Sequence, residues 1–161
     1  MRKVSGSVDA LLMECVHPVK GIWCVRFAQQ NEGNGQATYM EEEFGYRPSE
    51  EEIRDIITQY INQETDRLIL SGYQWEGNQV WLSSVNQLNY KAAYDLAVQT
   101  GGKNLPVRFK FGTDESPVYC EFRTLEKLEA FYTGALSHIQ RAVEEGWQQK
   151  DNIDLTPYRN E

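Results

Sequence analysis

The fold class is decided by residues 49–82, which read SEEEIRDIITQYINQETDRLILSGYQWEGNQVWL. Ser49 and Glu52 have the spacing of a capping box, in which the serine accepts from the third helical amide and the glutamate reaches back. Pro48 opposes extension of the helix towards the N-terminus. Apolar side chains then recur at helical spacing, and they are Ile53, Ile56, Ile57, Tyr60, Ile61 and Leu68. The pattern predicts a helix that ends at Gly72 in a left-handed conformation.

The second half of this stretch, Tyr73–Leu82, predicts a β-hairpin with Gly77-Asn78 as a two-residue loop. The expected cross-strand pairs are Trp75 with Val80 and Tyr73 with Leu82 on one face, and Gln74 with Trp81 on the other. Since this register puts the two tryptophans on opposite faces, we expect one of them to stay near the surface.

A second helix and a second hairpin follow. Ser84 and Gln87 again have capping-box spacing, and Gly101-Gly102 ends the helix that they begin. Residues 107–111 and 118–122 alternate apolar and polar side chains, as in an antiparallel hairpin with one solvated face.

Thr124 is the expected cap of a long last helix. The side chains expected to face inward are Leu125, Leu128, Tyr132, Leu136, Ile139 and Val143. The apolar spacing fades near Trp147, and we expect Asp151–Glu161 to be a polar tail.

The N-terminal region predicts three irregular strands, Leu11–Val16, Ile22–Ala28 and Thr38–Phe44, with a glycine-rich turn at residues 31–35. We expect Glu41-Glu42-Glu43 to lie on a solvated sheet edge, where charge opposes pairing with another sheet. The fold class is therefore α+β: N-terminal β strands, then helix–hairpin–helix–hairpin–helix, with the helices packed on antiparallel sheet. The expected division is an N-terminal β region, 1–46, and an α+β domain with a polar tail, 47–161.

Composition excludes several classes of function. The chain has 161 residues, 40% of them hydrophobic, and a formal net charge of −8, so a nucleic-acid partner is disfavoured because phosphate binding needs clustered Lys and Arg. No run approaches the roughly 20 apolar residues of a membrane helix, and the first 30 residues lack a signal pattern. We therefore expect synthesis in the cytoplasm and no membrane partner. Cys15, Cys24 and Cys120 form an odd set without a C-x-x-C pair and are expected to be reduced, buried side chains.

No catalytic motif, metal motif or cofactor motif is found. His17 and His138 are the only histidines, and neither has a zinc-binding spacing. Cys120 falls in the middle of a predicted strand, which is a poor place for an activated thiolate. We expect no catalytic residue, no metal and no cofactor, and hence no enzyme. Because carboxylates are plentiful, a glycosidase-like pair of acids remains open.

The candidate binding residues are aromatic, since Trp and Tyr dominate the energetics of interfaces. They are Tyr73, Trp75, Trp81, Tyr90 and Tyr94, which cluster in the first hairpin and the helix after it. The competing interpretation is that another layer of the fold covers them.

The segment Tyr73–Ser83 (YQWEGNQVWLS), continued by Asn86–Asn89 (NQLN), resembles a small domain family of phages and prophages whose members are encoded near tail-fibre genes. Tyr90–Ala97 (YKAAYDLA) is similar to versions from phages of Bacteroides-type gut bacteria. The resemblance covers roughly residues 48–155, and it leaves residues 1–46 as a possible adaptor.

This resemblance implies a non-enzymatic virion or tail-associated structural protein that docks on other virion proteins, in a symmetric assembly. It also implies a location in the host cytoplasm during synthesis and in the virion afterwards. Two alternatives stay open. One is an assembly chaperone for a tail fibre, and the other is a carbohydrate-binding or glycan-active module.

Overall fold

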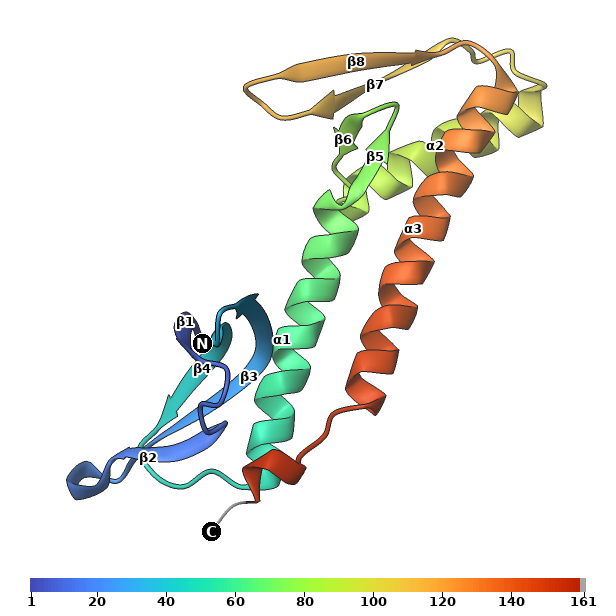
Figure 1. The fold of residues 1–161 in the computed structure, drawn as a ribbon. Coiled ribbons are helices and arrows are strands. Elements are labelled where there is room, and N and C mark those ends of the chain that lie inside the picture. Colours follow the sequence, from blue (N-terminus) through green and yellow to red (C-terminus); the bar gives the residue numbers. More distant parts are fainter. Residues whose placement is uncertain (160–161) are drawn as a thin grey trace. The chain divides into compact units, whose positions relative to one another are not determined.

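The computed structural model describes residues 1–159, and the α+β class predicted from the sequence is confirmed. The chain divides into two compact units: unit 1 is Met1–Tyr60 with Lys150–Glu161, and unit 2 is Ile61–Gln149. The elements in chain order are β1 (Arg2–Ser7), β2 (Met13–His17), η1 (Pro18–Lys20), β3 (Ile22–Gly33), β4 (Gln36–Phe44), α1 (Glu50–Ser71), β5 (Tyr73–Trp75), β6 (Asn78–Val80), α2 (Ser84–Thr100), β7 (Val107–Gly112), β8 (Pro117–Phe122), α3 (Leu125–Asp151) and η2 (Thr156–Tyr158) (Figure 1).

Unit 1 is built on a four-stranded antiparallel sheet with the order β1-β4-β3-β2, one strand more than predicted. The missing strand was β1, whose sequence RKVSGS has only one large apolar residue and so gives no alternating pattern. Its register comes instead from pairing with β4, from Arg2 opposite Glu41 to Ser7 opposite Gln36. The turn predicted at 31–35 is narrower, because residues 31–33 belong to β3 and only Asn34-Gly35 forms the loop. Asn34 and Gly35 both have positive φ, as a two-residue turn of type I′ requires.

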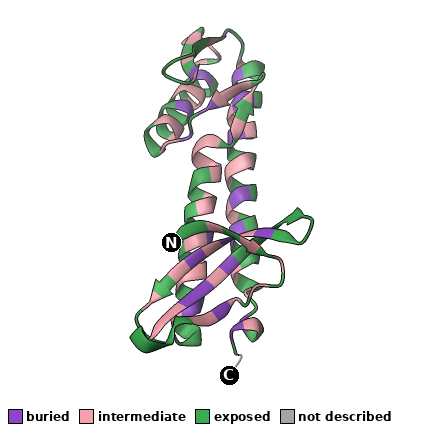
Figure 2. Cartoon of the chain, turned by 60° about the vertical axis from the view of Figure 1, so that its left-hand side comes forward, coloured by how far each residue is buried: buried purple, intermediate pink, exposed green. Residues whose placement is uncertain are grey.

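The core of unit 1 brings together residues from opposite ends of the chain. Val25 and Phe27 of β3 pack with Ile53 of α1 and with Leu155 and Tyr158, which follow α3. Along β4, buried positions alternate with more exposed ones (Figure 2). The unit therefore includes the start of α1 and the C-terminal segment, and its limit is not the boundary between residues 46 and 47 that the sequence suggested.

The predicted polar tail at Asp151–Glu161 is wrong over its described part. Leu155 and Tyr158 are 7% and 5% exposed, and the Tyr158 hydroxyl donates to the carbonyl oxygen of Arg26 at 2.8 Å. The Arg159 guanidinium also pairs with Glu50 at the start of α1 at 2.9 Å. The sequence does not show these anchors, because two apolar residues among polar neighbours carry no periodic signal.

The predicted solvated edge at Glu41–Glu43 is also wrong, because β4 is an interior strand of the sheet. Glu41 is only 5% exposed. Its carboxylate accepts from Arg2 and from Arg26, each at 2.8 Å. Burial alone would raise the pKa of Glu41, but hydrogen bonds and charge from the two guanidinium groups outweigh it and hold that pKa below its usual value.

We predict that Glu41→Gln lowers the free energy of unfolding by about 1–3 kcal/mol at neutral pH, because two guanidinium groups lose a charged partner. A carboxyl with a lowered folded pKa contributes stability above its unfolded pKa and loses it as pH falls through the folded value. The difference between wild type and variant should therefore shrink on acidification in urea unfolding. Glu121→Gln, at the exposed pair with Arg123, is the control and should cost less. Equal losses for both variants would contradict the account.

The capping box of α1 is confirmed. The Glu52 amide donates to Ser49 Oγ at 3.2 Å, and the Ser49 amide donates to Glu52 Oε2 at 2.8 Å. The left-handed ending predicted at Gly72 is wrong, since Gly72 is not among the positive-φ residues. The glycine is required for space instead: a Cβ there would lie 2.4 Å from the Leu68 carbonyl oxygen and 3.1 Å from His138 Cε1.

The first hairpin forms, but with a different register from the one predicted. Its loop is Glu76-Gly77, with φ of 48° and 80°, and it pairs Tyr73 with Val80 and Trp75 with Asn78. A type I′ turn favours glycine at its second position, which Glu76-Gly77 supplies and Gly77-Asn78 does not. The shift leaves Trp81 beyond the end of β6.

The later boundaries follow the sequence closely. Helix α2 has Ser83, not Ser84, as its N-cap, with Ser83 Oγ accepting from the Asn86 amide at 3.2 Å. The predicted end of this helix at Gly101-Gly102 is confirmed, and Gly101 adopts the left-handed conformation there. The second hairpin, β7–β8, has the expected apolar face, and the Thr124 hydroxyl caps α3 at 3.3 Å from the Lys127 amide.

The core of unit 2 is aromatic and centres on Phe131 of α3, which is fully buried. Six rings have their centroids 5.0–6.1 Å from that of Phe131, and they belong to Tyr73, Trp75, Tyr90, Phe109, Phe111 and Phe122. The predicted inward stripe of α3 omitted Phe131 and included Leu136, which is 40% exposed. The buried residues of α3 are Leu128, Phe131, Ala135, Ala142 and Gly146.

Two glycines of α3 let other parts of unit 2 come close. A Cβ on Gly134 would lie 2.5 Å from the Tyr73 hydroxyl, and one on Gly146 would lie 2.5 Å from Thr65 Oγ1. The Tyr73 hydroxyl passes over Gly134 to donate to the Phe131 carbonyl oxygen at 3.1 Å. The absence of a side chain at Gly134 therefore fixes how closely β5 packs on α3.

We predict that Gly134→Ala destabilises unit 2 by about 1–3 kcal/mol relative to Ser137→Ala, an exposed control on the same helix. With Tyr73→Phe added, the nearest ring atom would be Cζ at 3.4 Å, so the double variant should be more stable than the sum of the two single losses indicates. Thermal and urea unfolding measure these values. Strictly additive losses would show that the Tyr73–Gly134 contact does not set the packing.

Candidate functional site

The structure separates the five predicted binding residues. Tyr90 is 4% exposed and belongs to the core of unit 2, and Tyr73, Trp75 and Tyr94 are partly buried against the same core. Trp81 differs from them, because 48% of its surface is exposed. Four of the five residues are thus part of the scaffold, and Trp81 alone among them lies open to solvent.

Two apolar side chains, one of them predicted to face inward, lie on the surface of unit 2. Leu88 of α2 is 66% exposed and Leu136 of α3 is 40% exposed. They line one groove of about 260 Å³ between these two helices. Its other lining residues are Leu82, Gln87, Tyr90, Lys91, Tyr132, Ala135 and Ile139.

The groove between α2 and α3 is apolar at its base and carries few charges. Tyr132 and Ile139 of α3 form part of its wall, and the Tyr132 ring is stacked on Tyr94 at a centroid distance of 5.0 Å, which holds it in place. Lys91 is the one charged lining residue, and it forms an ion pair with Asp95. Such a groove suits apolar side chains of another molecule.

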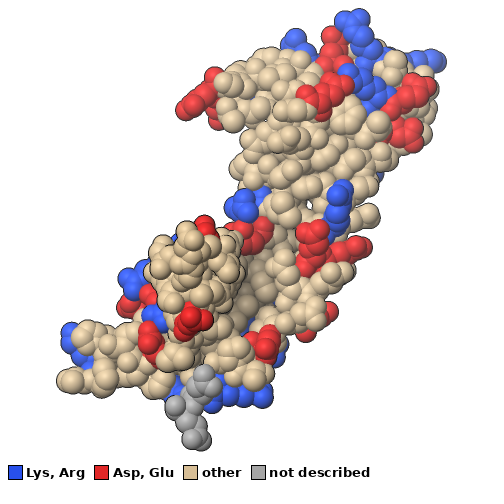
Figure 3. Space-filling view, viewed as in Figure 1, with Lys and Arg blue, Asp and Glu red and all other residues tan. Residues whose placement is uncertain are grey.

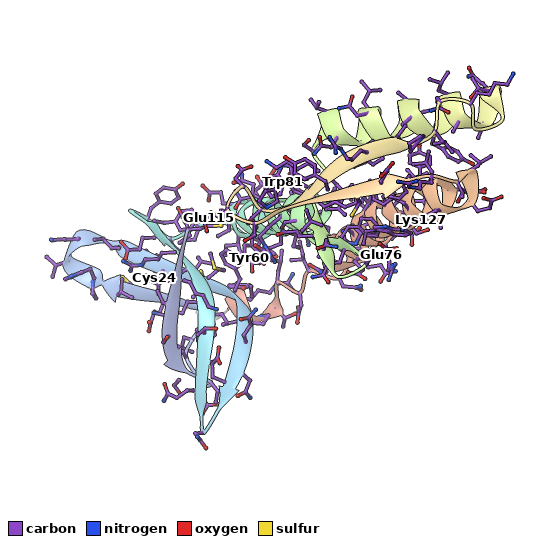
Figure 4. All side chains as sticks on the ribbon, turned by 90° about the horizontal axis from the view of Figure 1, so that it is seen from above. Cys24, Tyr60, Glu76, Trp81, Glu115 and Lys127 are labelled. Atoms are coloured by element: carbon purple, nitrogen blue, oxygen red, sulfur yellow. The ribbon has the colours of Figure 1, made fainter. Side chains whose placement is uncertain are left out.

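A second hollow in unit 2, of about 370 Å³, contains Trp81 and is more polar. Trp81, labelled in Figure 4, lies where β6 leads into α2. The β7–β8 hairpin supplies Lys110, which lies within β7, and Asp114, which lies in the turn between the strands. Gln79 and Asn86 add two amide side chains. We call this hollow the Trp81 pocket.

The residues with the chemistry of a metal site are engaged by other groups. Cys24, Glu41 and Glu43 present ligand atoms within 4.8 Å of one another. Both carboxylates form ion pairs with arginines: Arg2 pairs with both glutamates, and Arg26 pairs with Glu41. Burial, followed by the nearby carboxylates, raises the pKa of the Cys24 thiol. The four charged side chains form an ion-pair network beside the thiol.

His138 has a structural position in unit 2. Its Nε2 lies 2.9 Å from the Leu68 carbonyl oxygen, and its ring contacts that of Tyr73 at a centroid distance of 5.7 Å. His17 is exposed in unit 1. Of the cysteines, Cys24 is buried while Cys15 and Cys120 are half-buried, and burial raises the pKa of the Cys120 thiol as well.

The protein is thus an α+β chain with two candidate binding surfaces on unit 2. One is an apolar groove and the other is a more polar pocket that contains Trp81, and both lie next to the aromatic core. Figure 3 shows one face of unit 2, with a broad uncharged area and charged side chains mostly at its margins.

The chain belongs to the family described as "Domain of unknown function (DUF4376)", which matches residues 52–160. The match includes all of unit 2 and leaves strands β1–β4 of unit 1 outside. No curated protein and no solved structure matches the chain. None of the described helices has both the length and the apolar character needed to cross a membrane.

The burial of Tyr90 predicts a loss of stability in alkali. Burial raises the pKa of Tyr90 from its ordinary value of 10.0 to about 12. An acid with a raised folded pKa contributes stability that is complete below its unfolded pKa and is lost as pH rises through the folded value. The free energy of unfolding should therefore fall between pH 10 and pH 12.

Urea unfolding at pH values below and above 10 measures this loss, and Tyr90→Phe should reduce it. Tyr119→Phe is the matched control, because Tyr119 is 61% exposed and its ionisation needs no opening of the core. A Tyr90→Phe variant with the full alkaline loss would contradict the burial of this side chain.

Proposed function

We propose that the chain is a non-enzymatic protein of a bacteriophage particle, located in the tail or close to it, that docks on other virion proteins. Its docking surface is the groove between α2 and α3. The observation that carries the proposal is the exposure of Leu88 and Leu136 beside an apolar hollow of about 260 Å³.

The chemistry of the groove favours a protein partner. Apolar side chains exposed next to one another lose contact with water when a partner covers them, which yields roughly 25 cal/mol per Å² of apolar surface. Leu88 and Leu136 can flank an apolar anchor of the partner, with Tyr90 and Ala135 below it. Because the chain carries a net charge of −8, a partner with basic residues around its apolar anchor would be favoured electrostatically.

The assignment to a phage particle is supported by the sequence resemblance of Tyr73–Ser83 and Tyr90–Ala97 to domains encoded near tail-fibre genes. In this proposal the chain folds in the host cytoplasm and is then incorporated into the virion. Several copies dock around a symmetry axis, as is usual for repeated components. Residues 1–46, which lie outside the family match, act as an adaptor to one particular partner.

A non-enzymatic role is supported by the way in which potentially reactive groups are held. Glu41 is bound by two guanidinium groups, and the pKa values of the Cys24 and Cys120 thiols are raised by burial, which opposes formation of the nucleophilic thiolate. These groups stabilise the fold in this proposal.

We predict that Leu88→Glu, with or without Leu136→Glu, prevents incorporation of the chain into particles, because a carboxylate in the groove opposes apolar docking. Leu96→Glu is the matched control: Leu96 is on the same helix and 47% exposed, but it does not line the groove. Quantitative mass spectrometry of purified particles should find wild type and Leu96→Glu in a fixed ratio to the capsid protein. Circular dichroism should show that all variants fold.

The same experiment separates the proposal from the second candidate, an assembly chaperone for a tail fibre. A chaperone would use the same groove transiently, so it would be absent from purified particles while Leu88→Glu still blocked fibre assembly. Particles that contain Leu88→Glu at the wild-type ratio would refute docking through the groove.

A further inference from the structure

We propose that the Trp81 pocket is a binding site for a neutral pyranose sugar, with the indole of Trp81 as the stacking surface. The pocket is formed within unit 2 by Gln79, Trp81, Asn86 and the β7–β8 hairpin. It shares no lining residue with the groove between α2 and α3, so a sugar ligand is a function additional to protein docking.

The outward position of Trp81 is imposed by its neighbours. Val80 and Leu82 on either side are 0% and 1% exposed, and both belong to the core of unit 2. The Trp81 carbonyl oxygen also accepts from Asn86 Nδ2 at 2.7 Å. The backbone is therefore fixed at three successive residues. Binding a ligand on the 48% exposed indole would not require any further ordering of the backbone.

The two side-chain amides of the pocket are fixed by hydrogen bonds from their nitrogens, which leaves their oxygens able to accept from a ligand. Gln79 Nε2 donates to the Ser71 carbonyl oxygen at 3.1 Å, and Asn86 Nδ2 donates to Trp81 at 2.7 Å. Each bond uses the amide nitrogen and leaves the side-chain oxygen without a hydrogen-bond partner among residues 1–159. Two positioned acceptors thus accompany the aromatic surface.

The β7–β8 hairpin completes the pocket with one group of each charge. Lys110 Nζ lies 3.0 Å from Asp114 Oδ1, and both side chains are well exposed. An ammonium group donates to a hydroxyl oxygen and a carboxylate accepts from a hydroxyl, so the pair can bind adjacent hydroxyls of one ring. Because the charges cancel, the pair gives no preference for an anionic ligand.

Together these groups match the two kinds of surface on a pyranose. The ring's C–H bonds carry partial positive charge and pack on the electron-rich face of an indole. Its hydroxyls donate to the amide oxygens and exchange hydrogen bonds with the charged pair. The volume of about 370 Å³ lies in the range of roughly 300–1,000 Å³ typical of small-molecule sites. A purely apolar ligand would leave these polar groups without partners.

The test is a titration of the ¹⁵N-labelled full chain with methyl glucoside, methyl galactoside and N-acetylglucosamine, observed by NMR at the tryptophan indole N–H groups. We expect at least one sugar to shift the Trp81 signal saturably, with a dissociation constant in the millimolar range. The signal is assigned by its loss in Trp81→Phe. Trp147, which is 58% exposed and outside the pocket, serves as the internal control.

Variants give the second arm of the test. Trp81→Ala and Asn86→Ala should each weaken binding of that sugar at least tenfold, while Trp147→Ala should leave it unchanged. No saturable shift with any of the three sugars, or equal shifts at Trp81 and Trp147, would overturn the proposal. Loss of particle incorporation in Trp81→Ala without sugar binding in wild type would instead assign the pocket to a protein partner and also overturn it.

Discussion

The contact on which the rest of unit 2 depends is the packing of aromatic rings around Phe131. Phe131 is fully buried, and the rings around it come from the first hairpin, from α2 and from β7–β8. One side chain of α3 thereby fixes three other elements. Gly134, one turn later, lets Tyr73 reach the Phe131 carbonyl oxygen, so the same turn of helix sets both the ring cluster and the spacing of β5.

Both candidate binding surfaces are consequences of this core. Since Tyr90 of α2 and Phe131 of α3 face each other at a centroid distance of 5.0 Å, the two helices approach closely at the core, and Leu88 and Leu136 remain outside it. The burial of Val80 and Leu82 in the same core leaves Trp81 between them on the surface. The core thus fixes the positions of Leu88, Leu136 and Trp81, although these three side chains are not part of it.

Local sequence signals predicted the elements well and the tertiary environment less well. The capping box at Ser49, the end of α2 at Gly101 and the apolar face of β7–β8 depend on nearby residues, and all three were predicted correctly. Glu41 was assigned to a solvated edge because sequence does not reveal which strand is interior. Tyr158 was assigned to a polar tail because its partner, Arg26, lies far away in the sequence.

The lack of information on tertiary neighbours also explains why the candidate site was only partly predicted from the sequence. Tyr90 and Trp81 look equivalent in sequence, but Tyr90 is buried and Trp81 exposed, because the core of unit 2 takes up Val80 and Leu82 on either side of Trp81. Leu88 and Leu136 fit helical stripes, and only the packing of α2 and α3 shows that they face a groove. The signal that set Trp81 apart was its place between Val80 and Leu82, since strand alternation turns it to the face opposite these two apolar neighbours.

The central claim is that this aromatic core holds the groove between α2 and α3 ready for another protein. A cryo-electron microscopy reconstruction of the chain in its native assembly tests that claim most directly. The account predicts apolar side chains of a neighbouring protein seated between Leu88 and Leu136, with the Phe131 cluster unchanged. A reconstruction in which the groove faces solvent and every contact is made elsewhere would contradict it.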